Sequence, residues 1–416
     1  MDEGKSSDYT SSDVFSIGLD AFEKNAGVIG IPATNLAIFT KALTEGCLRE
    51  IALNGSSCGV RMTDEDLGQL VLCLQQSQIP LESLALRNHH ITDDSLEYIR
   101  DSLMAASAGQ VNTLQHLDLE GNAITFNGLK FLRLNSSELC PLNSLNLCGN
   151  PLGEKGALAI SEALLSNRSL TSIKLNSCGF TLSGIVAIAA SMASGGRHIE
   201  ELEIDRPILP KYVPGEESSD HFSRILGSSR SLRALSLKYH NIGDSGARLL
   251  AYNLNKAKFL ISLNLECNKV GIAGAEALAS YLIVQAREQA AARNPVATIG
   301  GNQNGDVAVG LQHLRLSYNS VGNQGAVALA DAIRVNQSLL TLTLKNNSIN
   351  DEGLLAMKRA LEVNNTLQSL QLFGNEFYAT GSQFHDLIEY RLPYIDLKLD
   401  IKTYVRDGIY MIAEQN

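Results

Sequence analysis

The sequence predicts an α/β solenoid in which about eleven strand–turn–helix modules follow one another along the chain. The segment "LNLCGNPLGEKGALAISEALLSNRSL" begins at Leu145, and closely similar segments begin at Leu314 and Leu342. In each segment apolar residues first alternate and then, after Asn and Gly, recur with helical spacing, so a strand precedes a helix. Because the modules return at a nearly fixed interval, we expect one continuous array.

The core of each predicted strand is an L-x-L pair whose two apolar side chains face the same side. The second apolar residue of the pair returns after 28 to 33 residues, apart from one step of 51 residues. The intervening side chains should face solvent. The second core positions are Leu53, Leu86, Leu119, Leu147, Leu175, Ile204, Leu237, Leu265, Leu316, Leu344 and Leu372.

Two further columns follow each strand. Asn recurs three residues after the core leucine, as at Asn319 and Asn347, where its amide can bond to the backbone of a buried turn. Gly recurs nine residues after the leucine, as at Gly325 and Gly353, which indicates close approach between successive helices. Cys178 replaces Asn once, and His89 and His240 replace it in two other modules.

A helix between every two strands makes the strands parallel. Strands are ~4.8 Å apart, whereas packed helices need ~8–10 Å. The array should therefore bend into a horseshoe, with a concave parallel β-sheet inside and convex helices outside.

The ends and two interruptions depart from the repeat. We expect a disordered N-terminus over 1–13, a helical N-terminal cap over 14–46, the array over 47–390 and a C-terminal β-hairpin cap over 391–416. The array should contain an irregular, proline-rich repeat with a loop over 206–221. It should also contain an insertion over 283–310, in which "IVQAREQAAARN" could lengthen a helix and the rest is rich in Gly and Asn. The insertion could be functional or simply a tolerated loop.

Composition excludes several classes of function. The net charge is −10 without a basic stripe, so we expect no direct contact with nucleic acid. The polar N-terminus is unlike a signal peptide, and no apolar run is long enough to span a membrane. Seven cysteines without CxxC spacing favour reduced thiols inside the cell, so the sequon Asn167-Arg-Ser169 carries no weight.

The pattern LxxLxLxxNxIxxxGxxxLxxxL, found from Leu48 to Phe384, resembles the leucine-rich repeat of the ribonuclease-inhibitor-like type. This resemblance implies a leucine-rich-repeat horseshoe that binds other proteins, in a larger assembly, and is not an enzyme. It also implies an intracellular place: cytoplasm, with cilium, axoneme, nucleus or nucleolus as further possibilities. No catalytic, metal or cofactor site, and no small-molecule substrate, is expected.

Two alternatives stay open on the same resemblance. GTPase-activating proteins of the Ran type share the repeat and act through an Arg and an Asn at the rim, where Arg87 and Asn88 stand here without a matching motif. Ribonuclease inhibitors also share it, but they are richer in cysteine and more regular. Elsewhere, "GNPLGEKGA" lacks the spacing of a phosphate loop, and the eight histidines form no HxxxH or Cys/His cluster.

Charged and aromatic residues near the predicted concave face form the candidate partner-binding site. Acidic residues of the irregular repeat could bind a basic segment, and aromatic residues could anchor it, although a solvated charged face and tyrosines packed on their own turns would explain the same pattern. The candidates are Glu200, Glu201, Glu203, Asp205, Tyr212, Lys238, Tyr239, Tyr318 and Lys345.

Overall fold

The structure is a computed structural model. It describes residues 49–58, 61–76, 81–104, 113–136, 140–195, 198–209, 216–293, 310–378, 380–390 and 396–415. The segments 1–13 and 14–46, expected to be a disordered N-terminus and a helical cap, lie outside the described residues.

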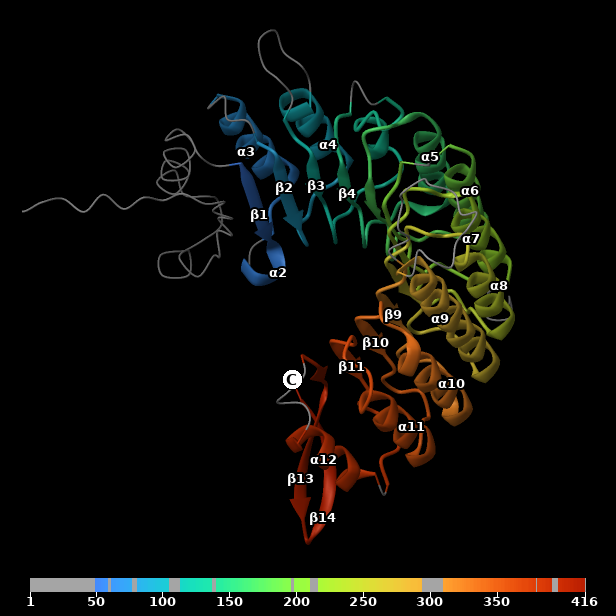
Figure 1. Cartoon of the computed structure of the whole chain (residues 1–416). Coiled ribbons are helices and arrows are strands. Elements are labelled where there is room, and N and C mark those ends of the chain that lie inside the picture. Colours follow the sequence, from blue (N-terminus) through green and yellow to red (C-terminus); the bar gives the residue numbers. More distant parts are fainter. Residues whose placement is uncertain are drawn as a thin grey trace, which may run out of the picture. The chain divides into compact units, whose positions relative to one another are not determined.

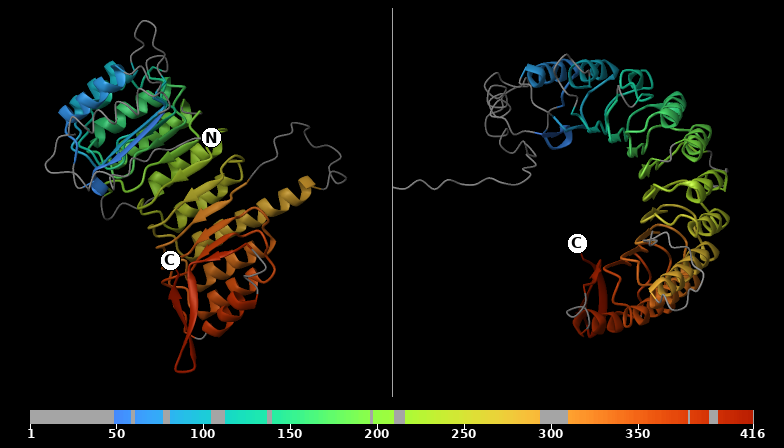
Figure 2. Two further views of the ribbon diagram at one scale, coloured as in Figure 1. Left: turned by 90° about the vertical axis from the view of Figure 1, so that its left-hand side faces the viewer. Right: turned by 45° about the horizontal axis from the view of Figure 1, so that its top comes forward.

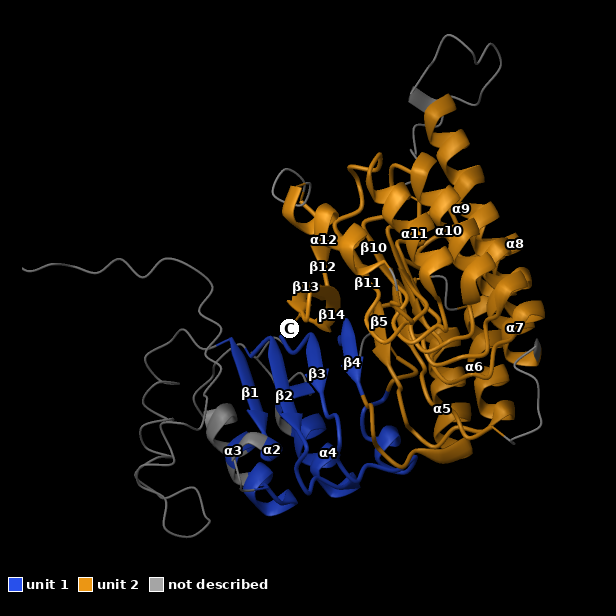
Figure 3. Cartoon of the chain, turned by 90° about the horizontal axis from the view of Figure 1, so that it is seen from below, with its two compact units in different colours: residues 1–133, 138–146 blue, residues 134–137, 147–416 orange. Residues whose placement is uncertain are grey.

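The chain divides into two compact units, coloured separately in Figure 3. Unit 1 comprises Met1–Arg133 and Glu138–Asn146, and unit 2 comprises Leu134–Ser137 and Leu147–Asn416. Each unit repeats the strand–turn–helix module that the sequence predicts, with parallel strands hydrogen-bonded in sequence order.

In unit 1, each strand pairs in register with its neighbour, so that Leu84 lies beside both Ile51 and Leu117. The strands are β1 (Glu50–Asn54), β2 (Ser83–Arg87), β3 (His116–Asp118) and β4 (Ser144–Asn146). The helical segments are α2 (Gly55–Cys58), α3 (Asp64–Gln76), α4 (Asp93–Ile99), the π-helical η2 (Arg100–Met104) and the 3-10 turn η3 (Gly128–Lys130). In the third module η3 stands where the repeat predicts a full helix; Arg133 soon follows with a left-handed φ of 48°.

In unit 2, helices cover the outer side of a concave parallel sheet (Figures 1 and 2). The strands are β5 (Ser172–Lys174), β6 (Glu201–Glu203), β7 (Ala234–Ser236), β8 (Ser262–Asn264), β9 (His313–Arg315), β10 (Thr341–Thr343), β11 (Ser369–Gln371) and β12 (Lys398–Leu399). The helices are α5 (Gly153–Ser166), α6 (Leu182–Ser194), α7 (Glu216–Ser228), α8 (Asp244–Leu254), α9 (Ile272–Arg293), α10 (Gly322–Val335), α11 (Asp351–Leu361) and α12 (Gly381–Tyr390).

The core lies between sheet and helices. Leucines of the L-x-L pairs, such as Leu314 and Leu316, are fully buried, and so are helix residues such as Leu329 and Ile333. The predicted glycine column lets the helices approach: a Cβ on Gly325 would lie 2.9 Å from the Cβ of Ala275 on the preceding helix. The sequence-based interpretation of this column is confirmed.

The two interruptions differ in part from expectation. α7 begins at Glu216, so residues 216–221 are helical and not part of a loop over 206–221 as expected. Residues 210–215 lie outside the described ranges. The predicted lengthening of a helix is confirmed, since α9 runs from Ile272 to Arg293. The remainder of the 283–310 insertion lies outside the described residues, apart from Gly310.

The C-terminal region adds a strand that the alignment of eleven L-x-L pairs does not contain. In β12, Leu399 pairs in register with Leu370 of β11. Strands β13 (Ile401–Arg406) and β14 (Ile409–Glu414) then form an antiparallel hairpin. Asp407 and Gly408 both have positive φ, as a two-residue hairpin turn requires. His385 of α12 holds the hairpin through Thr403 Oγ1 at 3.0 Å.

Buried asparagine side chains join successive modules, as the sequence predicts. Asn319 donates from Nδ2 to the carbonyl oxygens of Leu265 and Leu316, at 2.9 and 3.0 Å, and accepts from the amide of Val270 at 2.9 Å. Asn347, which is fully buried, repeats the arrangement one module later. Each side chain thus satisfies backbone groups of its own turn and of the preceding turn.

A second asparagine column follows the helices, and the sequence analysis missed it. Asn167, Asn336 and Asn364 come directly after or soon after a helix end, in N-x-S/T-L tetrapeptides. Asn336 is 1% exposed; it donates to the carbonyl of Leu282 at 2.9 Å and accepts from the amide of Leu339 at 2.8 Å. These asparagines therefore tie each helix end to the start of the next strand.

Candidate functional site

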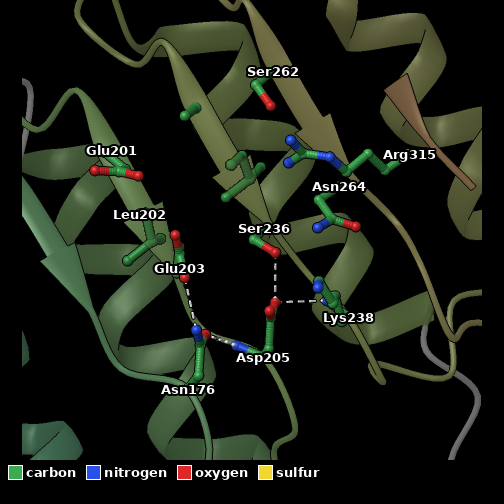
Figure 4. Close-up of a pocket in the computed structure, with 12 residues that line it drawn as sticks. Asn176, Glu201, Leu202, Glu203, Asp205, Ser236, Lys238, Ser262, Asn264 and Arg315 are labelled. Atoms are coloured by element: carbon green, nitrogen blue, oxygen red, sulfur yellow. Dashed lines mark hydrogen bonds between the residues drawn. The ribbon is translucent and has the colours of Figure 1, made fainter. Parts of the chain in front are cut away.

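The inner face of the sheet in unit 2 contains a hollow of about 210 Å³ over strands β6 to β9 (Figure 4). Most of its polar lining comes from the two strand residues that flank the first core leucine and from the residue directly after the second. The lining residues are Asn176, Glu201, Leu202, Glu203, Asp205, Ala234, Leu235, Ser236, Lys238, Ser262, Asn264 and Arg315.

Short side chains create the depth of this hollow. β7 contributes Ala234 and Ser236, and β8 contributes Ser262 and Asn264. In the adjoining strands the equivalent positions carry longer side chains, such as Glu203 on β6 and Arg315 on β9. The floor is therefore short and polar, and charged walls of opposite sign flank it.

The acidic wall is largely compensated from within the sheet. Lys174 Nζ of β5 lies 3.2 Å from Glu201 Oε1 and 2.8 Å from Glu203 Oε1. Burial acts to raise the pKa of Glu203, but hydrogen bonds from Lys174 and Asn176 outweigh it and lower the pKa below its ordinary value. One lysine is shared between two carboxylates, so this wall keeps a surplus of one negative charge.

Asp205, expected to contact a partner, is instead bound into a turn. It is 7% exposed and accepts hydrogen bonds from Ser236 Oγ and from the backbone amide of Lys238, both at 2.8 Å. Burial raises its pKa despite these bonds. Its side chain holds the start of the following turn, the role that Asp400 plays toward Leu372 in the last module.

The candidate lysines are also engaged. Lys238 Nζ lies 3.3 Å from Glu266 Oε2. Lys345 Nζ lies 3.3 Å from Asp400 Oδ2 and 3.1 Å from Glu414 Oε1, so it connects β10 to β12 and to the C-terminal hairpin. Lys345 thus has an intramolecular role, which the sequence did not reveal because its partners lie more than 50 residues away.

Arg315 is the charged residue of the hollow that sequence analysis missed. Throughout the described ranges, no hydrogen bond or ion pair engages its guanidinium. Its positive charge nevertheless acts on its neighbour, because burial and then Arg315 lower the pKa of His313. In Figure 4 the side chain extends over β8 between Ser262 and Asn264. The available signal was its place between the core leucines in "LRL".

The two candidate tyrosines lie at the edge of the sheet and do not line the hollow. Tyr239 and Tyr318 come two residues after their core leucines, where both have a left-handed backbone, with φ of 61° and 60°. They are 41% and 55% exposed. The guanidinium of Arg206 lies over the Tyr239 ring at 4.4 Å and donates to its hydroxyl at 3.1 Å.

This left-handed position is a third column that sequence analysis did not detect. In many modules this position has a small or turn-favouring residue, because a positive φ brings a larger side chain too close to the backbone. A few modules have a bulky residue there. Its members are Asn88, Gly121, Gly149, Ser177, Arg206, Tyr239, Cys267, Tyr318, Asn346 and Gly374. Tyrosine is a costly occupant of such a turn, so its presence twice suggests a use other than stability.

The remaining candidates contribute less to the hollow. Glu200 is not among the lining residues, and its carboxylate lies 3.5 Å from Arg233. Tyr212 lies outside the described residues. The structure therefore brings together Glu201, Glu203, Asp205 and Lys238, and it places Glu200, Tyr239, Tyr318 and Lys345 elsewhere.

The remaining reactive groups form no metal-binding cluster within the described ranges. Within the described ranges, no three His, Cys, Asp or Glu side chains gather as metal ligands, and no helix has the length and apolar character needed to cross a membrane. Cys178 donates from Sγ to the carbonyl of Leu147, and burial raises its pKa. In unit 1, Arg87 Nε donates to Asp118 Oδ2 at 2.8 Å, so this arginine has an intramolecular partner.

Comparison with known proteins agrees with the repeat architecture. A family model described as "Leucine Rich repeat" matches residues 112–132, 166–189, 228–251, 256–279, 311–330 and 335–358. Human NACHT, LRR and PYD domains-containing protein 14 is 29% identical over 169 residues, which are 40% of this chain and 14% of that protein. The pig ribonuclease inhibitor is 26% identical over 338 residues, covering 71% of this chain and 63% of that protein.

The mouse ribonuclease inhibitor is 28% identical over 329 residues, which cover 69% of this chain and 68% of that protein. The chain thus spans a small part of its NACHT-containing relative and about two thirds of the two inhibitors. Together with the repeated module and the parallel sheet, these matches show that the chain contains leucine-rich repeats and is similar to ribonuclease inhibitors.

Proposed function

We propose that the chain is a non-catalytic scaffold that binds other proteins through the inner face of the sheet in unit 2. The observation that carries this proposal is the hollow over β6 to β9, where charged walls flank a floor of short side chains. Other charges on this face are paired within the sheet, as Lys174 is with Glu203. Arg315 is left out of that pairing.

The proposed surface keeps part of the predicted set. Glu201 and Glu203 form one wall and Arg315 the other, while exposed Tyr239 and Tyr318 at the edge supply aromatic contact area. Aromatic and arginine side chains are the usual anchors of protein interfaces. Asp205 and Lys345 are assigned structural roles, because their partners are within the chain.

The place of action rests on resemblance alone. We propose that the chain, including its C-terminal "LKLDIKTYVRDGIYMIAE", resembles leucine-rich repeat-containing protein 34 of animals. That resemblance suggests the cytoplasm with a nucleolar role, and related repeat proteins that are structural parts of cilia suggest an axonemal role. In-cell localisation of the tagged chain would separate these two, because each predicts a distinct compartment.

The proposal is tested by affinity purification of the full chain from cells, with the double variant Glu201→Lys, Glu203→Lys and the single variant Tyr318→Ala in parallel. Partners that bind the inner face should be depleted by one or both variants. Glu276→Lys with Glu288→Lys, on the outer helix α9, is the charge-matched control. Partners retained equally by all four chains would contradict inner-face binding.

A second candidate is inhibition of a ribonuclease, favoured by the two inhibitors among the relatives. Titrating the chain into an assay of a pancreatic-type ribonuclease tests this function directly. If micromolar concentrations of the chain leave the rate of RNA hydrolysis unchanged, the function is excluded. A Ran-type GTPase-activating role is less well supported, because Arg87 is paired with Asp118. If adding the chain to purified Ran leaves the rate of GTP hydrolysis unchanged, this role is excluded.

A further inference from the structure

The polar groups left over on the β8–β9 side of the hollow can all donate hydrogen bonds. Arg315 offers its guanidinium, Asn264 its Nδ2 and Ser262 its hydroxyl; within the described ranges no acceptor engages any of them. The Asn264 oxygen is already used, since it accepts from the amide of Glu266 at 3.1 Å. The β8–β9 side of the hollow therefore presents donors and one uncompensated positive charge to an incoming group.

We propose that this side of the hollow binds an Asp or Glu carboxylate of a partner peptide, a specificity that rests on the proposed function. A carboxylate carries one negative charge, which Arg315 neutralises, and it accepts the paired N–H groups of a guanidinium. A phosphoryl group would bring nearly two negative charges close to Glu203 and Asp205, and the single charge of Arg315 would neutralise only one of them. The carboxylate is thus the better match.

The opposite wall sets the second requirement. Lys174, Glu201 and Glu203 together carry one surplus negative charge, so a basic side chain fits over β6. β6 and β9 are three strand spacings apart, or about 14 Å at ~4.8 Å each. An extended peptide advances about 3.4 Å per residue, so about four residues cover this span. The ligand is a peptide with a basic and an acidic residue roughly four positions apart.

The order of strands explains why Arg315 stays available. Its position on the strand is occupied by Glu203, Ser236 and Asn264 in the three preceding modules. Ser236 and Asn264 separate the arginine from the nearest glutamate in its column, so the two cannot form an ion pair across the floor. A partner peptide that bridges both walls would complete the charge pairing that the sheet leaves open.

The test is selection of a displayed library of random twelve-residue peptides on the full wild-type chain and on Arg315→Gln. Peptides enriched on wild type should share an acidic residue about four positions from a basic one. As synthetic peptides they should bind Arg315→Gln at least about tenfold more weakly, because a charged hydrogen-bonded pair is lost. Arg315→Lys, which keeps the charge but not the planar fork, should give an intermediate loss.

The control is Arg334→Gln on the outer helix α10, which should bind the peptides as wild type does. Arg315→Gln should keep the wild-type melting temperature, since no intramolecular partner is lost. The inference is overturned if the selected peptides bind Arg315→Gln as tightly as they bind the wild-type chain. It is also overturned if selection on the wild-type chain enriches no peptides beyond those selected on Arg315→Gln. If such peptides still bind the double variant Glu201→Lys, Glu203→Lys more weakly than the wild-type chain, the proposal of inner-face binding stands and only the role of Arg315 is wrong. If none of these variants weakens peptide binding, both proposals are wrong.

Discussion

At the scale of single residues, the proline of the irregular repeat explains why the next module has His240 in place of asparagine. In regular modules the amide three residues after the core leucine donates to the asparagine of the next module, as His240 N does to Asn268 Oδ1 at 3.0 Å. In the irregular repeat this place is Pro207, which has no N–H. An asparagine at 240 would therefore lack that donor. Histidine donates from Nε2 to the carbonyl of Ile204 at 2.8 Å, while its buried Nδ1 has no hydrogen-bond partner among the described residues.

This burial makes stability depend on pH. The His240 ring is fully buried beside Phe222, and burial lowers its pKa to about 4. The unfolded chain takes up this proton near the ordinary value of 6.5. As pH falls from 6.5 toward 4, the unfolded state therefore gains the proton first, and the free energy of unfolding should decrease by up to roughly 1.4 kcal/mol per pH unit.

Urea unfolding at stepped pH, for wild type and His240→Asn, measures this effect. Between pH 6.5 and 4, the free energy of unfolding of His240→Asn should depend less steeply on pH than that of the wild type. The remaining dependence comes from other groups, including His89 and His313, whose pKa values burial also lowers. His116→Asn, at an exposed position, is the control. Parallel pH profiles for wild type and His240→Asn would contradict the assignment.

Tyr318 allows stability and binding to be separated. Its left-handed backbone is strained for a bulky residue and suits asparagine, which occupies the same column as Asn346 in the next module. Tyr318→Asn should therefore raise the free energy of unfolding by up to about 1 kcal/mol. The same change should weaken capture of inner-face partners, because an exposed ring is lost. A destabilised variant would show that the ring supports its own turn.

At the scale of elements, helix spacing depends on Gly325. A Cβ at this position would lie 2.8 Å from Val321 Cγ1 and 2.9 Å from Ala275 Cβ, so α9 and α10 would have to separate. Gly325→Ala should cost about 1–3 kcal/mol in equilibrium unfolding, although alanine has the higher helix propensity. Ala328→Gly, a change in the same helix away from this contact, is the matched control for propensity. A stabilised Gly325→Ala chain would show that the helices can move apart freely.

Elements also differ in how far the sequence predicts them. The L-x-L pairs and the asparagine column were found because neighbours in the stack impose the same requirement on every module. The same alignment missed β12, although "LDI" at 399–401 comes 29 residues after the preceding pair, because a hairpin and not a helix follows it. For the site, the sequence places Glu201 and Glu203 on one strand but does not show that Lys174 of the neighbouring strand pairs with both of them, since pairing across strands depends on register.

At the scale of the whole molecule, stability should spread by contact between neighbouring modules. Leu316 is fully buried, and Leu316→Ala should cost on the order of 2–5 kcal/mol through lost burial and a cavity. Hydrogen exchange should show the largest loss of protection in β8 to β10 and little change in β2 of unit 1, because each module contacts only its neighbours. Uniform loss of protection across both units would instead indicate one cooperative body.

The asparagines that tie helix ends to strands have a practical consequence for producing this protein. Asn167, Asn336 and Asn364 all lie in N-x-S/T sequons, and each is at most 8% exposed in the folded chain. In a secreting host, glycosylation acts on the nascent chain before these side chains are buried. A glycan on Asn336 would occupy the place where its Nδ2 donates to Leu282, so each sugar attached would trap the chain unfolded. Expression should therefore be directed to the cytosol of the host, where the unmodified amides can reach their carbonyl partners.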